Sequence, residues 1–525
     1  MSEGEHSRPL ILDGSSLTIS SLVEVARELR PVEVAEEALR RVEASRAVLE
    51  EVVSGRVRCY GITTGLGELS KVLISPEEAL ELQENIVLSH ACAVGEPLPT
   101  EAVRAIMLLR ANTLARGRSG VRRELVEKLV ELLNKGVHPI IPSRGSVGAS
   151  GDLALLAHLA LVIAGRPEGR AEYGGRVMRA DEALREAGIE PLKLDHKEGL
   201  ALINGTSATT ALLALSIHDA EVLVKTADVC LAMTLEAVGG FLEAFDKRYL
   251  SERPSFPLSN GHLACAGNVA RLTRGSRLLR ADGLKRPHDP YSVRCAPQVH
   301  GAVREGLEFA KRITEAELNS TDDNPLFFEE EPYCVSGGNF HGQPLALAAD
   351  VLALSMTTLG NASERRTALL TTRSLNELLP SFLVHPRARA GLNSGFMIVQ
   401  YVAASLASEN KALSHPASVD SIPTSGNFED IVSMSMTAAL KAREVVDNVA
   451  YILAVEFVCA CQALAIRGPG EAGEGTRAAY ELALGAGIEP VVEDRALHEH
   501  IERAAELVRT GEVLRAVEEA VGRLA

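Results

Sequence analysis

A short loop with very little side-chain bulk has a residue order that allows its backbone to react with itself. Residues 145–151 read GSVGASG. The Gly151 amide nitrogen is unhindered by a side chain, so it can attack the Ala149 carbonyl carbon and close a five-membered ring. Loss of water, and then of the Ser150 hydroxyl as a second water, gives 4-methylidene-imidazol-5-one, an electrophile made from the chain itself. Ala-Ser-Gly is a common tripeptide, so its surroundings decide whether this chemistry is relevant.

The residues that follow this loop suit such a group. Asp152 comes directly after Gly151 and is placed to move protons during cyclisation. The apolar run 153–165 then predicts a buried helix. The positive end of that helix would point at the new group and stabilise negative charge on it.

Helical patterns dominate the rest of the chain, and these elements must position the reactive loop. The ranges that predict helices are 75–93, 100–117, 121–135, 206–245, 302–318, 343–370, 394–413 and 430–466. Alternating strand patterns are few and short, as at 172–179. The fold class predicted is therefore mostly α, with a bundle of long central helices and a smaller, loop-rich N-terminal region.

Composition divides the chain into three expected regions. Residues 1–205 carry most of the polar, Gly- and Asn-rich loops, and residues 206–466 carry the long helices. The stretch RGPGEAGEG at 467–475 predicts a break before a short helical tail, 467–525. Polar loops on a rigid helical scaffold are common places for chemistry.

The overall composition excludes several classes of function. The 525 residues include 54 basic and 70 acidic ones, a formal charge of −16 that disfavours sequence-independent nucleic-acid binding. Eight scattered cysteines without a Cys-x-x-Cys pair fit a reducing compartment better than a disulfide scaffold. The N-terminus is polar and acidic, and we expect no uninterrupted span of about 20 apolar residues. These features predict a cytoplasmic protein that binds neither membranes nor nucleic acid.

A series of motifs extends the evidence from the reactive loop to most of the chain. In order they read YGITTGLG at 60, LQENIVLSHA at 82, GSVGASGDLALLAH at 145, KEGLALINGT at 197, DPYSVRCAPQVHG at 289, NSTDDNPL at 319, SGGNFHGQPLA at 336 and SGFMIVQYVAASLASENKALSHPASVDSIPTS at 394. Together they resemble the aromatic amino acid lyase family, which includes histidine, phenylalanine and tyrosine ammonia-lyases and related aminomutases. The resemblance covers roughly residues 55 to 465.

This resemblance implies a fumarase/aspartase-like helical architecture and a homotetramer whose active sites are built from loops of three subunits. It implies that Ala149, Ser150 and Gly151 form the methylidene-imidazolone, with no metal and no external cofactor. The partner expected is a small amino acid substrate. The reaction would remove ammonia and a β-proton, which requires both an electrophile and a base.

The resemblance also implies individual roles. Tyr60 matches the catalytic tyrosine and is the expected general base, which requires a nearby positive field to lower the pKa of the phenol. Tyr291 and Glu429 are the other groups that could take the β-proton. Arg294 resembles the anchor of the substrate carboxylate, because its guanidinium suits bidentate binding.

Two further positions are expected to contact the reactive group or the substrate. Asn204 would hydrogen-bond the ring oxygen of the methylidene-imidazolone and help hold negative charge. Phe340, in GGNFHG, would pack on the substrate or on the cofactor.

Two positions indicate which amino acid is the substrate. The pair Ser89-His90 matches the selectivity pair of the histidine enzymes, since phenylalanine lyases have Phe-Leu and tyrosine lyases His-Leu there. Glu429 matches a glutamate typical of the histidine enzymes and can accept a hydrogen bond from an imidazole. Both favour L-histidine as substrate and trans-urocanate as product.

The sequence also departs from the family pattern. His288 stands where glutamine is usual just before Asp-Pro-Tyr, so it could alter substrate position, pH dependence or specificity. The remaining departures are Thr63, Leu66, Leu155, Gln343, Phe428 and Ile431. The cofactor-forming residues match the family pattern. Because of these departures, the sequence indicates the identity of the substrate less firmly than it indicates the fold.

Three other functions compete with this interpretation. One is a lyase or 2,3-aminomutase for another aromatic amino acid, which the product would reveal. A silent helical scaffold is opposed by the full set of matching site residues. A metalloenzyme is opposed by the lack of a His-Glu-x-x-His motif and by the spacing of His498 and His500, which places them on different faces of a helix.

Overall fold

Capping residues set the ends of several helices in the computed structural model, which describes residues 8–55, 57–280, 284–389 and 391–525. Helix α3 (Pro76–His90) begins after Ser75, whose hydroxyl accepts the backbone N–H of Glu78 at 3.3 Å. The Glu78 carboxylate in turn accepts the backbone N–H of Ser75 at 2.9 Å. Helix α5 (Arg123–Lys135) ends at Gly136, which takes the left-handed φ of 71° that glycine allows.

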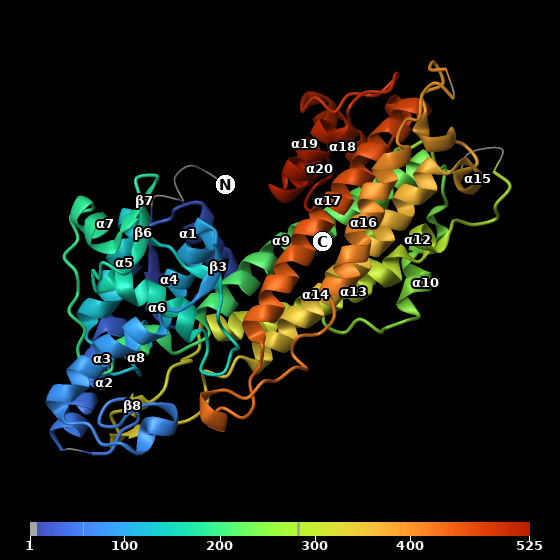
Figure 1. The fold of residues 1–525 in the computed structure, drawn as a ribbon. Coiled ribbons are helices and arrows are strands. Elements are labelled where there is room, and N and C mark those ends of the chain that lie inside the picture. Colours follow the sequence, from blue (N-terminus) through green and yellow to red (C-terminus); the bar gives the residue numbers. More distant parts are fainter. Residues whose placement is uncertain (1–7, 56, 281–283, 390) are drawn as a thin grey trace. The chain divides into compact units, whose positions relative to one another are not determined.

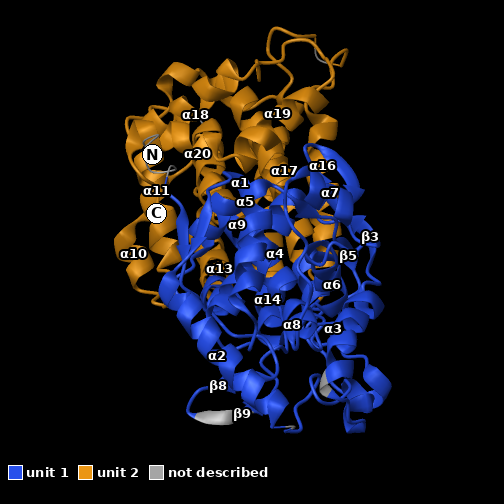
Figure 2. Ribbon diagram, turned by 90° about the vertical axis from the view of Figure 1, so that its left-hand side faces the viewer, with its two compact units in different colours: residues 1–218, 311–350, 416–440 blue, residues 219–310, 351–415, 441–525 orange. Residues whose placement is uncertain are grey.

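Contacts divide the chain into two compact units (Figure 2). Unit 1 consists of Met1–His218, Lys311–Asp350 and Pro416–Leu440. Unit 2 consists of Asp219–Ala310, Val351–His415 and Lys441–Ala525. The three consecutive regions expected from the sequence do not coincide with these units, because composition varies along the chain whereas each unit gathers three separate segments.

Unit 1 contains every strand of the described residues, together with several helices of moderate length (Figure 1). Its other helices are α1 (Ile19–Arg27), α2 (Glu36–Ser54), α4 (Thr100–Ala115), α6 (Leu153–Ile163), α7 (Ala180–Glu186) and α8 (Glu198–Ile203). Its strands are β1 (Leu10–Leu12), β2 (Val32–Val34), β3 (Val94–Pro97), β4 (His138–Pro139), β5 (Pro142–Arg144), β6 (Arg170–Tyr173), β7 (Arg176–Arg179), β8 (Leu326–Phe328) and β9 (Glu331–Val335). Short 3₁₀ turns η1 (Gly67–Lys71) and η4 (Ser425–Asn427) lie in two of its loops.

The strands form four small sheets rather than one large one. Strand β1 pairs with β2 in parallel, whereas β3 with β5 and β8 with β9 are antiparallel. The third sheet has the order β4-β6-β7, and its β6–β7 hairpin turns at Gly174-Gly175. This hairpin confirms the strand pattern expected at 172–179.

Long helices make up most of the remaining chain. Four of them contribute residues to both units: α9 (Ser207–Ala237), α13 (Ala296–Leu318), α14 (Gln343–Thr371) and α17 (Ser435–Arg467). Unit 2 also holds α10 (Lys247–Ser251), α11 (Gly261–Leu272), α12 (Tyr291–Arg294), α15 (Arg373–Asn376), α16 (Met397–Leu413), α18 (Glu474–Gly485), α19 (His498–Arg509), α20 (Glu512–Val521) and the 3₁₀ turns η2 (Leu242–Phe245), η3 (Ser381–Leu383) and η5 (Pro469–Glu471). The mostly helical fold predicted from the sequence is confirmed.

Buried charges tie the long helices of unit 2 together. The Arg366 guanidinium on α14 donates to both oxygens of Glu456 on α17, at 2.6 and 2.8 Å. The same carboxylate accepts the hydroxyls of Thr234 on α9 and Ser363 on α14. All four side chains are buried, so the carboxylate is satisfied without water.

Three long helices correct one expectation from the sequence. Ser207–Ala237, Gln343–Thr371 and Ser435–Arg467 are long and apolar enough to cross a membrane, judged by length and composition alone. The expectation that no such span exists was therefore wrong. Between 61% and 83% of the residues in their apolar windows are buried inside the protein, so these apolar side chains are used in internal packing.

The cysteines give a second correction. Cys59 and Cys334 form a disulfide, with their Cα atoms 6.1 Å apart, although the sequence favoured free thiols. They are 275 residues apart, so no spacing rule could pair them. The other six cysteines are free, and the first seven residues of the polar N-terminus lie outside the described part.

Candidate active site

The reactive loop, residues 145–151, connects strand β5 to helix α6 in unit 1, and its glycines are sterically required. Gly151 has a φ of +73°, and a Cβ there would lie 2.1 Å from the Gly205 carbonyl oxygen. Gly148 has a φ of +66°, and a Cβ there would lie 2.2 Å from the Ser433 hydroxyl. Only glycine fits both positions, so the loop is held in one tight conformation.

Backbone hydrogen bonds from two distant segments fix this loop. The Asp152 N–H donates to the Gly205 oxygen at 2.7 Å, and Gly151 and Gly205 form a parallel bridge. The Met434 N–H donates to the Val147 oxygen at 2.9 Å. The tripeptide is therefore braced from both sides before any chemistry takes place.

Asp152 sits directly beneath the loop and is fully buried. Its carboxylate accepts the Ser146 hydroxyl at 2.8 Å and both the N–H and the hydroxyl of Thr209, at 2.8 and 3.0 Å. Burial raises the pKa of Asp152, and the hydrogen bonds from Thr209 and Ser146 partly oppose this. A carboxyl group balanced in this way suits the proton-transfer role expected from the sequence.

The loop opens into a cavity of about 1020 Å³ lined by residues of unit 1. The lining includes Tyr60, His90, Ala149, Ser150, Asn204, Phe340 and Glu429, all of which were candidate site residues. Its wall is largely apolar, with the acidic side chains of Glu429 and Asp430 as exceptions. Among the described lining residues there is no lysine and no arginine.

Glu429 makes the most direct contact with the tripeptide. The Ser150 hydroxyl donates to one Glu429 oxygen at 3.0 Å, and the Thr424 hydroxyl donates to the other at 2.6 Å. The tight turn between Thr424 and Glu429 is closed by two backbone hydrogen bonds. Glu429 is therefore held in place, facing the hydroxyl that cyclisation removes.

Tyr60 enters the cavity from the loop that precedes α3. Its hydroxyl oxygen accepts the Gly67 N–H at 2.9 Å. Burial raises the pKa of Tyr60, and the negative charge of Glu429 raises it further, against the opposing effect of the Gly67 hydrogen bond. The positive field expected around Tyr60 is therefore not supplied by the described residues that line this cavity.

His90 is the last residue of α3. Its Nδ1 lies 3.0 Å from the Ser89 hydroxyl, which orients the ring. Burial lowers the pKa of His90, although the Ile86 backbone and the Glu429 charge oppose the shift. A neutral imidazole is therefore favoured at neutral pH, and it can hydrogen-bond a polar ring in the cavity.

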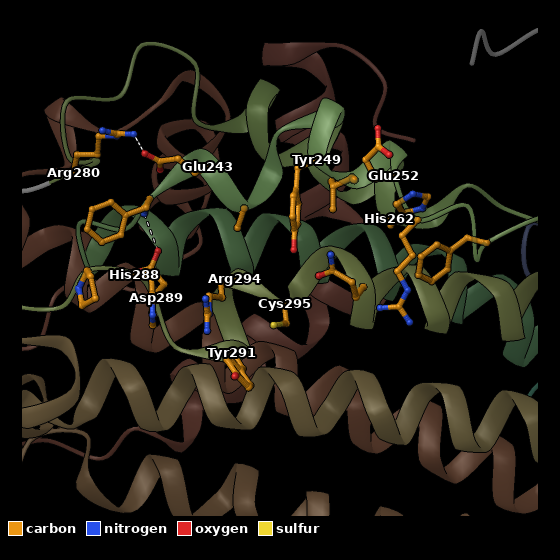
Figure 3. A pocket seen from close by; sticks show the side chains of 17 residues that line it. Glu243, Tyr249, Glu252, His262, Arg280, His288, Asp289, Tyr291, Arg294 and Cys295 are labelled. Carbon is orange, nitrogen blue, oxygen red and sulfur yellow. Dashed lines mark hydrogen bonds and ion pairs between the residues drawn. The ribbon is translucent and has the colours of Figure 1, made fainter.

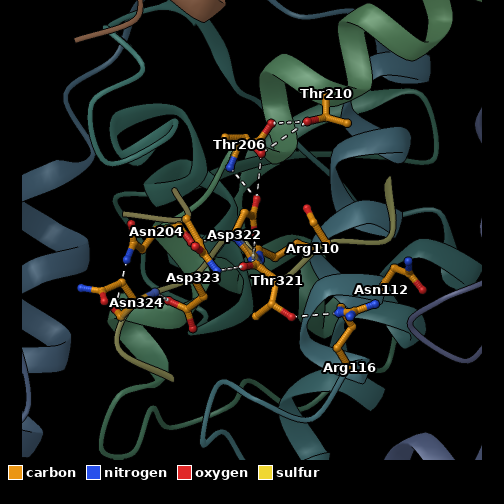
Figure 4. Close-up of polar contacts among 12 residues, drawn as sticks. Arg110, Asn112, Arg116, Asn204, Thr206, Thr210, Thr321, Asp322, Asp323 and Asn324 are labelled. Carbon is orange, nitrogen blue, oxygen red and sulfur yellow. Dashed lines mark hydrogen bonds and ion pairs between the residues drawn. The ribbon is translucent and has the colours of Figure 1, made fainter. Parts of the chain in front are cut away.

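Asn204 ends helix α8 within a buried polar network (Figure 4). Its amide nitrogen donates to the Asn324 oxygen at 3.0 Å, and Arg110 donates to its backbone oxygen at 2.9 Å. The Asn204 side-chain oxygen is buried without a hydrogen-bond partner. An unpartnered buried amide atom beside the tripeptide is consistent with a group that has still to be hydrogen-bonded there.

The remaining candidates line a different cavity, of about 1100 Å³, in unit 2 (Figure 3). His288, Tyr291 and Arg294 lie on or just before α12, and Tyr291 is 69% exposed. The Arg294 guanidinium stacks 4.7 Å from the centre of the Tyr291 ring, and its buried Nε has no hydrogen-bond partner. The structure thus gathers one set of candidates around Ser150 and the second set around Arg294.

The sequence motif NSTDDNPL contains buried residues to which no role was given. Arg110 donates to Asp322 at 2.9 Å, and Lys197 donates to both oxygens of Asp323 at 2.7 Å. The Thr206 N–H and hydroxyl both donate to Asp322. These ion pairs hold the segment that contacts Asn204. In the sequence, the two adjacent aspartates before Asn-Pro were the only feature that could have pointed to these ion pairs.

Three of the seven departures from the family pattern lie at the first cavity. Leu66, Phe428 and Ile431 line it directly. Thr63 instead bonds locally, donating to the Val57 oxygen at 2.8 Å, and Gln343 donates to the Ser418 oxygen at 3.0 Å. The apolar side chains at the first three positions therefore shape the space for substrate. Thr63 and Gln343 instead hydrogen-bond backbone carbonyl groups of neighbouring segments.

One cluster has the residue types of a metal site. Asp228, Cys265 and His300 of unit 2 offer ligand atoms within 4.8 Å of one another. Asp228 already pairs with His300 at 2.7 Å and with Arg304 at 2.8 Å. Because the Arg304 guanidinium already binds the Asp228 carboxylate, this cluster is a buried ion-pair network within the core.

The two histidines near the C-terminus lie on different faces of their helix. His498 is exposed and His500 is buried, as their spacing predicted.

Comparisons with known proteins give the family of this chain. The sequence pattern described as "Aromatic amino acid lyase" matches residues 17–484. The chain is 48% identical to histidine ammonia-lyase of Caldanaerobacter subterraneus, covering 96% of this chain and 97% of that protein, and 50% identical to that of Symbiobacterium thermophilum, covering 97% and 99%.

Solved structures show the same fold. Histidine ammonia-lyase of Trypanosoma cruzi has a TM-score of 0.89 at 40% identity, covering 98% of this chain and 96% of that chain. Tyrosine aminomutase of Streptomyces globisporus has a TM-score of 0.93 at 37% identity, covering 99% and 100%.

The fold and the braced tripeptide define a carbon–nitrogen lyase of the fumarase/aspartase-like helical type. The chain belongs to the aromatic amino acid lyase family. Enzymes of this family use the methylidene-imidazolone. The residues present fit that group: glycine is obligatory at 151, Ser150 faces the cavity, and Asn204 has a buried polar atom without a partner.

Proposed function

We propose that this protein eliminates ammonia from L-histidine to give trans-urocanate. The observation that carries the proposal is that His90 and Glu429 line the same cavity as Ser150. A neutral imidazole and a carboxylate together can bind both nitrogens of a substrate imidazole, which a phenyl ring could not use. The chain's similarity to histidine ammonia-lyases over nearly its whole length supports the same substrate.

Ala149, Ser150 and Gly151 would form the methylidene-imidazolone, which supplies an electrophilic carbon that makes the substrate amine a better leaving group. The chain's own residues do the rest. Asn204 would hold negative charge next to the tripeptide, and Phe340 would close the apolar wall on the substrate. Exclusion of water by the apolar lining strengthens each polar contact in the cavity.

Tyr60 would remove the β-proton, but its raised pKa keeps the phenol protonated at neutral pH. Proton abstraction therefore requires a positive charge close to the phenol. Glu429 cannot supply this charge and has the opposite effect. A cation must reach this cavity from elsewhere in the assembled enzyme.

We infer that the enzyme is a homotetramer and that the partner subunit's Arg294 and the partner subunit's Tyr291 complete this site. Two observations support this. The described lining of the first cavity has no arginine or lysine to bind a substrate carboxylate. Arg294 has a buried Nε without a partner beside an exposed tyrosine. A guanidinium anchors a carboxylate through paired hydrogen bonds, and its charge would also lower the pKa of Tyr60.

We further propose that the enzyme works in the cytoplasm as a soluble protein, where cellular dithiols would set the fraction of chains that carry the Cys59–Cys334 bond. Its relatives' names describe amino acid breakdown by ammonia release, which needs no membrane.

The test is to incubate the purified protein with L-histidine, L-phenylalanine and L-tyrosine separately. Ammonia release and the ultraviolet spectrum of each product are recorded, with Ser150→Ala as control. We expect urocanate from histidine alone, and none from the control. A cinnamate-type acid or a β-amino acid from an aromatic substrate would instead make this a lyase or aminomutase for that amino acid. Complete inactivity of a correctly matured chain would indicate a silent scaffold.

A further inference from the structure

A disulfide joins two segments that both line the first cavity. Cys59 immediately precedes Tyr60, and Cys334 lies in strand β9 two residues before Ser336, which lines the cavity. Both cysteines belong to unit 1. The bond therefore links the segment that carries the expected general base to the segment that carries Phe340.

The Tyr60 segment is held at its base, where Ile62 and Thr64 are buried and the Gln83 amide donates to the Gly61 oxygen at 3.2 Å. Among its described residues, the short turn η1 is the regular structure between α2 and α3. A bridge between Thr64 and Leu73 closes it into a loop, and Leu73 at the far side is 71% exposed. A loop with little secondary structure and an exposed tip samples several conformations unless its base is fixed.

Cys59 provides that fixed base. It is buried, its N–H donates to the Thr63 hydroxyl at 2.8 Å, and its oxygen accepts the Thr63 N–H at 3.0 Å. The side chains of Val48, Leu49, Val52, Ile62 and Phe327 pack with it in one apolar cluster. The residue directly before Tyr60 is therefore packed against helix α2.

The Cys334 end is equally well fixed. Cys334 pairs with Phe327 across the β8–β9 hairpin, and Phe327 is fully buried with its N–H donating to the Arg118 oxygen at 2.9 Å. Beyond Cys334, the Gly337 N–H donates to the Asn324 side chain at 2.8 Å. Strand pairing and the buried Phe327 therefore hold the Cys334 end of the bond.

We propose that the Cys59–Cys334 disulfide is a positioning device for Tyr60 in the elimination reaction. This role depends on the proposed function of Tyr60 as the base. A base must be held within hydrogen-bond reach of its proton, and a misplacement of about 1 Å reduces rates by about a hundredfold. The covalent bond removes the freedom of the loop base that would permit such a displacement.

Reduction by a dithiol would release this device reversibly. The dithiol transfers two electrons to the Cys59–Cys334 bond and becomes a disulfide itself, and each cysteine sulfur gains a proton. No atom of the tripeptide takes part in this exchange. The effect on the reaction should therefore appear without any change in the maturation of Ala149-Ser150-Gly151.

The first measurement counts free thiols in the denatured, unreduced protein by alkylation and mass spectrometry. We expect six of the eight cysteines to react. Reaction of all eight would show that no bond exists and would overturn the proposal. Intact mass of the same sample reports the loss of two water molecules from the tripeptide.

The second measurement compares Cys59→Ala, Cys334→Ala and the double variant with the wild type, using whichever amino acid the wild type converts. Either single substitution breaks the bond, so all three should lower kcat equally, by about 10- to 100-fold, with a smaller change in KM. A dithiol should lower the wild-type kcat to the same level, and reoxidation should restore it. The variants should not respond to the dithiol.

The control is Cys92→Ala, since Cys92 is exposed and free. It should keep wild-type kcat and the wild-type response to the dithiol. A wild-type kcat that stays within twofold on full reduction would overturn the proposal. If the wild type converts none of the three amino acids, the proposed function has failed. Hydrogen exchange of residues 57–75 then tests the positioning itself: faster exchange on reduction supports it, and unchanged exchange overturns it.

Discussion

The two large cavities of this molecule differ in charge as clearly as in position along the chain. The cavity of unit 1 holds the reactive tripeptide, Tyr60 and Glu429, and its described lining contains carboxylates but no lysine or arginine. The cavity of unit 2 is lined by three arginines, one of which, Arg280, pairs with Glu243 (Figure 3). Arg294 remains with a buried, unpartnered Nε.

This difference teaches that neither cavity alone can process an amino acid. An amino acid substrate presents a carboxylate, an amine and a β-proton. The first cavity offers an electrophile and a base, and the second offers a cation for the carboxylate. An enzyme assembled from several chains can bring the first cavity of one chain to the second cavity of another. Substitutions that alter one cavity at a time can therefore test this assembly.

The largest expected effect comes from removing the electrophile. Ser150→Ala cannot lose a hydroxyl as water, so the methylidene group cannot form. We expect the rate of ammonia release to fall by about 10⁴-fold or more, as is typical when a covalent catalyst is deleted. Intact mass should show that the variant has not lost the second water. Retention of activity within tenfold would place the chemistry elsewhere.

The next effect tests whether the two cavities that form one site come from different subunits. Arg294→Met removes the carboxylate anchor, and we expect kcat/KM to fall by about 10²- to 10³-fold. Tyr60→Phe removes the base in the first cavity. Each variant alone should be nearly inactive, but the two mixed, unfolded and refolded together should regain activity, because some sites then contain Tyr60 from one chain and Arg294 from another.

The control for this mixing experiment is the double variant, Tyr60→Phe with Arg294→Met in one chain. Mixed with either single variant, it cannot form a site with both intact residues. Equal recovery in this control would mean that the regained activity has another origin. No recovery in the first mixture, with tetramers present by mass, would mean that both residues act within one chain.

A smaller effect is expected from the residue that distinguishes the substrate. His90→Leu removes a neutral imidazole from the first cavity and leaves an apolar surface. We expect kcat/KM for L-histidine to fall by about 10- to 100-fold and the ratio of L-phenylalanine to L-histidine conversion to rise. Parallel progress curves with both amino acids measure this ratio. An unchanged ratio would remove His90 from substrate selection.

The fold could be predicted well from the sequence because its main elements are long and periodic. The pattern at 343–370 became α14, Gln343–Thr371, and the pattern at 430–466 became α17, Ser435–Arg467. The division into two units could not be predicted. Residues 311–350 and 416–440 join unit 1 through contacts with segments more than a hundred residues away, which no local pattern records.

The site was predicted unevenly for a similar reason. Motifs identified Tyr60, Ser150, Asn204 and Glu429, and the structure places all of them at one cavity. The positive field that Tyr60 requires as a base is not found among the described residues that line its cavity. A motif shows that a tyrosine is present, whereas its pKa depends on burial and on Glu429, which is brought near only by folding.

A half-buried acid, Glu317, extends the acidic character of the first cavity. The Thr206 hydroxyl donates to Glu317 at 2.6 Å and also lies 3.0 Å from Asp322. Asp322 accepts further hydrogen bonds from Arg110 and from the Thr206 N–H (Figure 4). Burial, together with the charge of Asp322, raises the pKa of Glu317 to about 7.

The proton that Glu317 takes up gives the smallest effect, on stability rather than on the reaction. The pKa of Glu317 rises on folding from 4.5 to about 7, so the folded state holds the extra proton between these values. Stability from Glu317 is therefore greatest at acidic pH and falls as the pH rises to about 7. The loss is about 2 kcal/mol between about pH 5 and pH 8.

The variant Glu317→Gln tests this pH dependence, because it keeps a hydrogen-bond donor but cannot ionise. Urea unfolding of both proteins at several pH values should show the wild type losing stability relative to the variant over this range. A difference that stays constant with pH would mean that Glu317 does not titrate there, and that the acidic character of the first cavity ends at its lining.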